Sequence, residues 1–150
     1  MAEFMIKHKA TGKFIHIPEL SNENDNTKLA FCDNVQDKMR FQFVPVERVW
    51  GYLKHVRSGK LVRPYEGNEN PQDFTNLVIH SEPCNGALFA MDQINDIIWH
   101  KSGKFVHPQS VMDLPKEGTG LILHSKKAPT LELQIVSAEN TDKEIFPKWI

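Results

Sequence analysis

The sequence has few cysteines, no long hydrophobic run and no recognisable export signal. Its two cysteines, Cys32 and Cys84, lack the paired spacing of a zinc site, and we expect two thiols rather than a disulfide. No apolar run approaches the roughly 20 residues that span a bilayer. The N-terminus lacks the basic and apolar segments of a secretory signal. These features predict no membrane insertion and a protein that is cytoplasmic or released unconventionally.

The chain also lacks an excess of charge of one sign. Its 18 basic and 19 acidic residues give a formal net charge of −1, and no basic block stands out. A neutral surface without such a block argues against nucleic-acid binding. The chain has no Gly-rich phosphate loop and no nucleophile elbow, so we expect neither an enzyme nor a cofactor. Its 150 residues favour one domain.

One segment occurs three times in the sequence. "IKHKATGKF", "LKHVRSGKL" and "IWHKSGKF" align on Gly12, Gly59 and Gly103. Two further blocks follow each glycine in the same order. They are "TKLAFC" (27–32), "TNLVIH" (75–80) and "TGLILH" (119–124), then "MRFQF" (39–43), "ALFAM" (87–91) and "LELQI" (131–135). This pattern predicts an internal threefold repeat at about 1–48, 49–95 and 96–150, within one domain over 1–150.

Each repeat contains four short strand candidates and no convincing helix. A Thr-Gly or Ser-Gly pair suits a tight turn between the first two strands, since glycine accepts a positive φ. Twelve short strands in three equal sets predict an all-β fold, the β-trefoil, with pseudo-threefold symmetry. We expect the tail "EIFPKWI" to supply the closing strand beside "EFMIKH". The predicted core comprises Ile6, Phe14, Leu29, Phe31, Phe41, Leu53, Leu61, Leu77, Ile79, Phe89, Ile98, Phe105, Leu121, Leu123 and Leu133.

Three histidines, His8, His55 and His100, occupy the same place just before the turn of each repeat. Three equivalent histidines around a threefold axis are one way to bind zinc. The alternative is that each caps its hairpin by hydrogen bonding to backbone. The capping interpretation is favoured because the adjoining turn repeats with the histidines and needs local support, so we expect no metal site.

A second polar set varies between the repeats. His16, Arg63 and His107 end the second strand candidate, and Cys32, His80 and His124 end the third. In a trefoil we expect these ends to lie close together, under an Asn/Pro-rich loop. A shallow pocket of neutral donors and acceptors suits a sugar. Ordinary polar residues at loop ends explain the pattern equally well.

The whole chain resembles the galactose- and N-acetylgalactosamine-binding β-trefoil lectins of sea mussels. The resemblance is carried by "IKHKATGKF", "WGYLKHVRSGKLVRPYEG", "LFAMDQINDIIWHKSGKFVHP" and the "NPxxxT" spacing at 70–75. It implies three sugar pockets, one per repeat, each made by a His-Pro-x-Gly-Gly loop and a downstream His-x-Asp-x-His cluster. It also implies pairing of two chains through the region of "MDQINDIIWH".

The sequence departs from the family pattern in each pocket. In the first, "HIPEL" replaces the loop and the cluster reads Cys32, Asn34, Gln36. In the second, "RPYEG" keeps the proline and one glycine, and the cluster reads His80, Glu82, Cys84. In the third, "HPQSV" is followed by His124, Lys126 and Ala128. The candidate sugar-binding residues are His16, Glu19, Asn34, Gln36, Arg63, Pro64, Tyr65, Gly67, His80, Glu82, His107, Pro108, His124 and Lys126.

The three pockets therefore predict different ligand contacts. Glu82 stands in the acidic position of the second pocket, with Tyr65 available for stacking. Asn34 and Gln36 offer amides in the first. Lys126 favours an anionic group, such as a sialic acid carboxylate or a sulfate, in the third.

These observations predict a lectin for galactose-containing oligosaccharides of cell-surface glycolipids or glycoproteins. Weak sites of this kind need multivalency, so we expect a homodimer. Ile94 and Ile97 are either exposed for self-association or part of the core, with the core slightly favoured. A fascin-like actin- or protein-binding trefoil, a trefoil protease inhibitor and a degenerate lectin are the alternatives. The basic stripe and the braced loop that would favour the first two are not evident in the sequence.

Overall fold

Twelve strands make up most of the regular structure in the computed structural model, which describes residues 3–18, 23–36 and 39–145. The strands are β1 (Phe4–His8), β2 (Phe14–His16), β3 (Ala30–Cys32), β4 (Phe41–Glu47), β5 (Trp50–His55), β6 (Leu61–Pro64), β7 (Thr75–His80), β8 (Leu88–Asp92), β9 (Ile97–His100), β10 (Phe105–Pro108), β11 (Leu121–His124) and β12 (Leu133–Ser137). Short 3-10 helices occur at η2 (Tyr65–Gly67), η3 (Asn85–Ala87) and η4 (Pro129–Leu131). None of the helices in these described ranges has the length and hydrophobicity needed to cross a bilayer.

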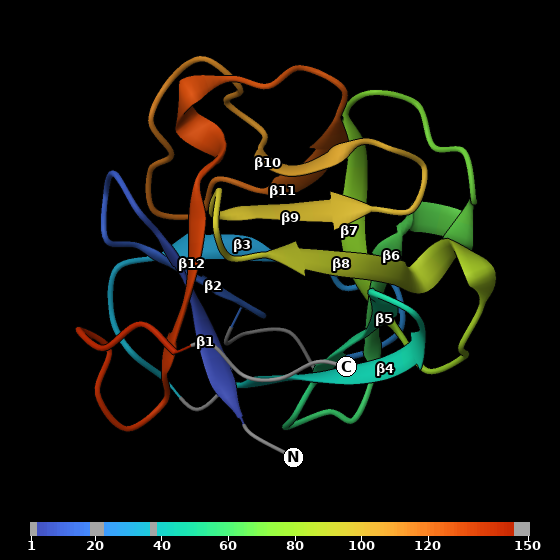
Figure 1. The fold of residues 1–150 in the computed structure, drawn as a ribbon, viewed down its shortest axis with the longest axis horizontal. Helices are drawn as coiled ribbons and strands as arrows, with labels where there is room; N and C mark the ends of the chain where they lie inside the picture. The colour runs from blue at the N-terminus through green and yellow to red at the C-terminus, as the bar shows by residue number, and fades with distance from the viewer. Residues whose placement is uncertain (1–2, 19–22, 37–38, 146–150) are drawn as a thin grey trace.

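Six of the strands close into a barrel. β1 pairs with β12 and β4, β4 pairs with β5, β5 with β8 and β8 with β9, all antiparallel. The ring closes between β9 and β12, where the Leu133 N–H donates to the Asp96 carbonyl at 2.7 Å. In Figure 1, β8 and β9 run side by side across the middle, with β12 and β1 next to them. Closure leaves no long open sheet edge in this ring.

The other six strands form three hairpins that lie against one another. They are β2–β3, β6–β7 and β10–β11. β7 pairs with β11, and isolated bridges join Lys28 to Val78 and Ala30 to Gly120. A six-stranded barrel with a cap of three hairpins is the β-trefoil, so the predicted all-β trefoil fold is confirmed. The limits of the three repeats remain a prediction.

The core follows the alternation of the strands. All fifteen predicted core residues are buried. Twelve of them belong to one cluster inside the barrel and cap, while Phe14 and Phe105 pack in smaller clusters at its side. In the segment "MRFQF", which leads into β4, Met39, Phe41 and Phe43 are buried and the residues between them are half-buried, as a period of two requires.

The three repeated histidines support the hairpins. His8, His55 and His100 are buried, and the Nδ1 atom of each lies 2.7–2.8 Å from the hydroxyl of the following turn. Nε2 of His8 donates to the Thr130 carbonyl at 2.6 Å, and Nε2 of His100 donates to the Gly86 carbonyl at 2.8 Å. Within the turns, the Thr11 N–H donates to Nδ1 of His8 at 3.3 Å and the Ser102 N–H donates to Nδ1 of His100 at 3.2 Å, so the capping interpretation is confirmed for these two. Because burial lowers the pKa of His8 and His100, both are neutral at pH 7.

Two further expectations concern the cysteines and the chain end. The Cys32 thiol donates to the Asn34 carbonyl at 3.3 Å and Cys84 lies beside Arg63, so the two do not form a disulfide, as predicted. The closing strand was predicted wrongly. β12, not the tail, pairs with β1 from Phe4 opposite Ser137 to His8 opposite Leu133. In the tail, Glu144 forms one isolated bridge with Val136, and residues 146–150 lie outside the described part.

Candidate functional site

In the third expected repeat, the two predicted histidines come together across the β10–β11 hairpin. His107 pairs with Ile122 and His124 pairs with Phe105, so the histidines are diagonal neighbours on one face. Their ring centroids lie 5.8 Å apart. His107 is fully buried, as is Pro108, whereas His124 is partly exposed and Lys126 is exposed. The side chains within direct reach of a ligand here are those of His124 and Lys126.

His107 is held as a neutral imidazole. Burial lowers its pKa, although the Pro108 carbonyl, 3.2 Å from Nδ1, acts in the opposite direction. Its Nε2 atom is buried, and the backbone of Lys126 also tends to raise this pKa. His124 is oriented by two neighbours. Its Nδ1 accepts the Lys126 N–H at 3.0 Å, and its Nε2 lies 3.7 Å from the Asp73 carboxylate.

In the second expected repeat, two groups of predicted residues form. His80 and Glu82 are linked, because the Glu82 N–H donates to His80 Nδ1 at 3.1 Å. A second group contains Arg63 and Gly67 beside Cys84. One guanidinium nitrogen of Arg63 lies 3.8 Å from the Cys84 sulfur, and the Arg63 Nε is buried without a hydrogen-bond partner among the described residues.

The loop of this second region is tightly built. Gly67 has a φ of 67°, and a Cβ at this position would lie 3.1 Å from both Arg63 and Cys84. Gly67 is therefore needed for its backbone conformation and for the space it leaves. Pro64 is buried, while Tyr65 has 51% of its surface exposed and Glu82 is exposed. Both of these predicted side chains are open to a ligand.

In the first expected repeat, the predicted residues are spread between the interior and the surface. His16 is buried, Gln36 is half-buried and Asn34 is exposed. His16 lies opposite Ala30 in the β2–β3 hairpin, and Cys32 lies opposite Phe14. Glu19 lies outside the described residues.

A set of carboxylates was missed by the sequence reasoning. Asp25 and Asp73, with Glu117, are here called the loop carboxylates, because each lies in the loop before β3, β7 or β11. Asp73 accepts both the N–H and the hydroxyl of Ser125 at 2.9 Å, and Asp25 does the same for Ser81 at 3.0 Å. Glu117 accepts the Asp33 N–H at 2.7 Å.

The loop carboxylates thus reach from one expected repeat into the next, where they meet the residue after the third strand. A signal for them was present in the sequence. Each stands two residues before the threonine of an aligned block, as in "DNTKL", "DFTNL" and "EGTGL". The lysines Lys60 and Lys104 lie 3.1 Å and 3.9 Å from Asp25 and Asp73. Desolvation tends to raise the pKa of Asp73, but its two bonds to Ser125, together with the electrostatic effects of His124 and Lys104, lower the pKa overall.

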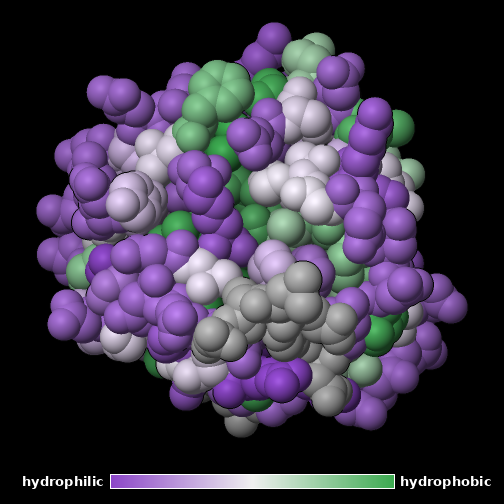
Figure 2. All heavy atoms as spheres, turned by 180° about the vertical axis from the view of Figure 1, so that it is seen from behind, coloured by the Kyte–Doolittle hydropathy of each residue, from purple (hydrophilic) through white to green (hydrophobic). Residues whose placement is uncertain are grey.

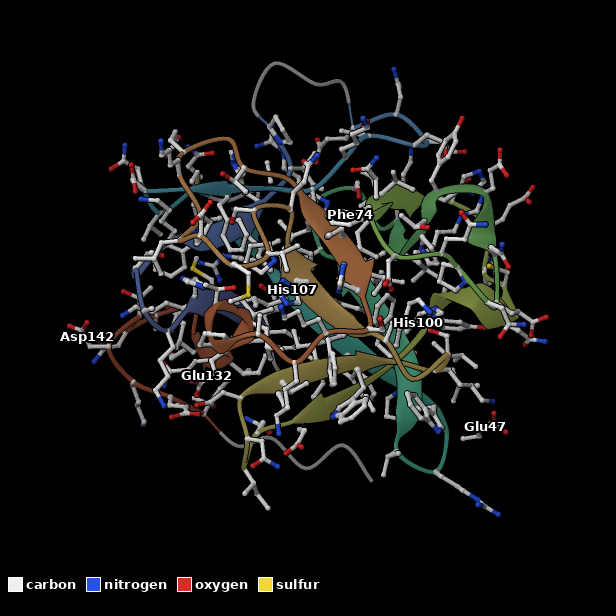
Figure 3. The ribbon with its side chains drawn as sticks, turned by 90° about the horizontal axis from the view of Figure 1, so that it is seen from above. Glu47, Phe74, His100, His107, Glu132 and Asp142 are labelled. Atoms are coloured by element: carbon white, nitrogen blue, oxygen red, sulfur yellow. The ribbon has the colours of Figure 1, made fainter. Side chains whose placement is uncertain are left out.

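Between carboxylate and threonine stands a residue with left-handed backbone. Asn26, Phe74 and Gly118 have φ values of 72°, 71° and 85°. Their N–H groups donate to the carbonyls of Ile79, Leu123 and Phe31 at 2.8–2.9 Å. Asparagine and glycine suit this conformation, but phenylalanine does not. Phe74 was also missed, and it packs on the His124 ring at 4.8 Å between centroids, in a T-shaped arrangement. Figure 3 shows Phe74 and His107 beside the β10–β11 hairpin.

None of the candidate sugar-binding residues borders either of two surface hollows of the described chain. A hollow of about 530 Å³ is bordered by Val49, Trp50, Ala90, Met91, Asp92, Trp99, Lys101 and Gly103. Another, of about 380 Å³, lies beside η4. The face in Figure 2 is mostly hydrophilic, with a narrow hydrophobic strip between hydrophilic groups. No group of three or more potential ligands that could hold a metal ion occurs within residues 3–18, 23–36 and 39–145.

The sequence pattern of the α-D-galactose-binding lectins (MytiLec) matches residues 4–138. The chain belongs to this family. A galactose-binding lectin of Crenomytilus grayanus is 46% identical over 54 residues, which cover 35% of this chain and 36% of that lectin. The α-D-galactose-binding lectin of Mytilus galloprovincialis is 44% identical over 55 residues, 35% of this chain and 29% of its own length. The alignments therefore span about a third of these lectins.

Solved structures show the same fold at low sequence identity. The designed threefold-symmetric protein ThreeFoil has a TM-score of 0.75 and 15% identity, over 87% of this chain and 94% of its own. SeviL, solved bound to the asialo-GM1 saccharide, has a TM-score of 0.65 and 10% identity, over 92% of this chain and 98% of its own. At such identities the likeness concerns the fold alone.

Proposed function

We propose that the protein is a lectin for galactose- or N-acetylgalactosamine-containing oligosaccharides of cell-surface glycans. It binds them without chemical change, through shallow pockets, one per expected repeat. The observation that carries the proposal is the family match over residues 4–138. The polar side chains at the ends of the cap hairpins that reach the surface, such as His124 and the half-buried Arg63, supply the groups for sugar hydroxyls.

The second pocket is the one we expect to bind most strongly. Exposed Tyr65 provides a flat face for the C–H side of a sugar ring, and exposed Glu82 accepts hydroxyl protons. Arg63 is half-buried beside them, and its guanidinium adds hydrogen-bond donors to this pocket. Removing the exposed acceptor at Glu82 should therefore weaken binding.

The third pocket has a different charge. Lys126 is exposed next to His124, and its backbone N–H fixes the orientation of that ring. An ammonium group in this position favours an oligosaccharide with a carboxylate or sulfate substituent. The first pocket offers the exposed amide of Asn34 and the half-buried amide of Gln36. Different pockets suit an extended oligosaccharide better than three identical monosaccharides.

Self-association would add to this binding, since two linked sets of sites raise avidity by ~10²–10⁴. Of the two isoleucines considered for pairing, Ile94 has 94% of its surface exposed, whereas Ile97 is buried against Phe105 and Leu131. Ile94 follows β8, on the rim of the barrel. We take a homodimer centred on Ile94 as part of the proposal.

The experiment that tests the function is a glycan array with the wild type and Glu82→Ala. Asp142→Ala, which removes a carboxylate that is 95% exposed in the loop after β12, is the matched control. Galactose-containing glycans should bind the wild type and the control equally well, and they should bind Glu82→Ala more weakly. If no glycan binds the wild type, the lectin function is wrong and a degenerate lectin or a protein-binding trefoil remains. Haemagglutination that free galactose inhibits would separate the lectin from both.

A further inference from the structure

Phe74 combines two unusual properties. It has 57% of its surface exposed although it is a large hydrophobic residue, and its φ of 71° lies in the left-handed region. A bulky side chain rarely adopts this conformation, because its Cβ crowds the backbone. Residues held in such conformations occur preferentially at binding sites, where the surrounding structure enforces them.

Contacts of Phe74 and of the neighbouring Asp73 enforce the left-handed backbone conformation of Phe74. Its N–H donates to the Leu123 carbonyl at 2.9 Å, and the neighbouring Asp73 is bound to Ser125 through two hydrogen bonds. The corresponding positions carry Asn26 and Gly118, which tolerate a positive φ. The turn therefore does not need an aromatic side chain, and Phe74 is the least suitable of the three residues for its backbone.

The ring of Phe74 is placed next to polar groups. It meets the His124 ring at 4.8 Å and 82°, and the exposed part of the ring faces solvent. The Asp73 carboxylate adjoins it in the chain, and Lys104 Nζ lies 3.9 Å from that carboxylate. An aromatic surface beside a carboxylate and an ammonium group is suited to a molecule with one apolar face and many hydroxyls.

We propose that Phe74 is the stacking platform of a carbohydrate subsite on the outer side of His124. The subsite takes a pyranose that presents an apolar C–H face, as galactose does, with hydroxyls directed to Asp73 and Lys104. This inference rests on the proposed lectin function and adds to its third pocket a residue that is not among the candidate sugar-binding residues. Neither of the corresponding positions, Asn26 and Gly118, has an aromatic ring, so the subsite belongs to the third pocket alone.

The test compares Phe74→Asn with Phe74→Tyr. Asparagine is the residue that the chain itself places at the corresponding position, so Phe74→Asn should keep or raise the melting temperature while removing the ring. We expect at least a fivefold loss of affinity, by calorimetry, for the best galactose-containing glycan of the array. Phe74→Tyr should bind within twofold of the wild type. Binding by Phe74→Asn within twofold of the wild type would overturn the inference and leave the lectin function standing.

A second measurement reports contact directly. In Phe74→Trp, the indole replaces the ring, and titration with the same glycan should shift its fluorescence, after subtraction of the wild-type signal from Trp50, Trp99 and Trp149. An unchanged difference spectrum at saturating glycan would contradict stacking at position 74. A wild type that binds no glycan at all would overturn both the lectin function and the subsite.

Discussion

Asp73 holds Ser125 with both oxygens of its carboxylate, accepting the backbone N–H at one and the hydroxyl at the other, each at 2.9 Å. The two residues are 52 positions apart in the chain. Asp25 and Ser81 repeat the arrangement 56 positions apart. These contacts fix the loop before a third strand to the end of the corresponding strand in the following expected repeat. They thereby position the residues around His80 and His124.

The first prediction concerns this contact. Asp73→Ala should lower the free energy of unfolding by about 1 kcal/mol, because it removes two hydrogen bonds to a charged group that is partly open to solvent. Urea denaturation measures the loss. Ser125→Ala should have a smaller effect, since it removes the hydroxyl and leaves the N–H. In the double variant the two losses should be less than additive. Full additivity would show that the contact contributes nothing.

The second prediction concerns acid stability. Burial lowers the pKa of His8, His100 and His107 from the ordinary value of 6.5, so the unfolded chain binds more protons than the folded chain just below that pH. Their contribution to stability is complete above pH 6.5 and is lost as the pH falls through the folded pKa values. Unfolding free energies from urea melts should decrease steadily between pH 7 and pH 5.

NMR titration supplies the check on that explanation. The imidazole signals of the three buried histidines should remain those of the neutral form below pH 6.5. Asp25 and Asp73 do not explain the same window. The pKa values of Asp25 and Asp73 are lowered from 3.8, by bonds to Lys60 and Ser81 in the first and to Ser125 in the second, so their contribution is lost only in more acidic solution. Stability that is flat from pH 7 to pH 5 would contradict the prediction.

The fold was predictable because its determinants repeat, whereas the site depends on features that do not. Aligned glycines and alternating apolar residues are enough to imply twelve strands and a closed barrel. The burial of His107 was not predictable, because the sequence pattern around a histidine at a strand end is the same whether loops cover the side chain or leave it exposed. Nor was the left-handed backbone of Phe74, because that conformation is enforced by Leu123 and Asp73 against the preference of the residue. The loop carboxylates could have been predicted, because each stands two residues before the threonine of an aligned block.

The third prediction addresses the close packing behind the second pocket. A Cβ on Gly86 would lie 2.1 Å from the Gly67 carbonyl oxygen, which is part of the backbone and cannot move alone. Gly86→Ala should therefore destabilise the protein by about 2 kcal/mol through overpacking and displace the loop that carries Tyr65. Gly59→Ala is the control. At Gly59 an added Cβ would meet no other atom within 4 Å, and the only obstacle is the φ of 73°. Gly59→Ala should therefore lower the free energy of unfolding by about 1 kcal/mol without changing glycan binding. Thermal melts and the glycan array give both readouts.

The fourth prediction separates the pockets by charge. Lys126 supplies an exposed cation beside His124. Lys126→Ala should therefore weaken the binding of sialylated or sulfated glycans several-fold and leave the affinity for neutral galactosides nearly unchanged. Increased salt should reduce the same interaction in the wild type. Lys28→Ala, which removes another exposed lysine, is the control. Equal effects of Lys126→Ala on anionic and neutral glycans would count against an anionic ligand in the third pocket.

The fifth prediction concerns self-association. Ile94 is almost fully exposed, next to Gln93, whose side chain donates to the Ile145 carbonyl and so holds this turn against the chain end. Ile94→Asp should convert a dimer into a monomer, because a buried, unpartnered carboxylate at an interface is strongly unfavourable. Sedimentation velocity measures the state, and haemagglutination should fall while affinity for a monovalent glycan stays the same. Leu114→Asp, at another exposed hydrophobic residue, is the control. A wild type that sediments as a monomer at all concentrations would exclude the dimer and require multivalency to come from the three pockets of one chain.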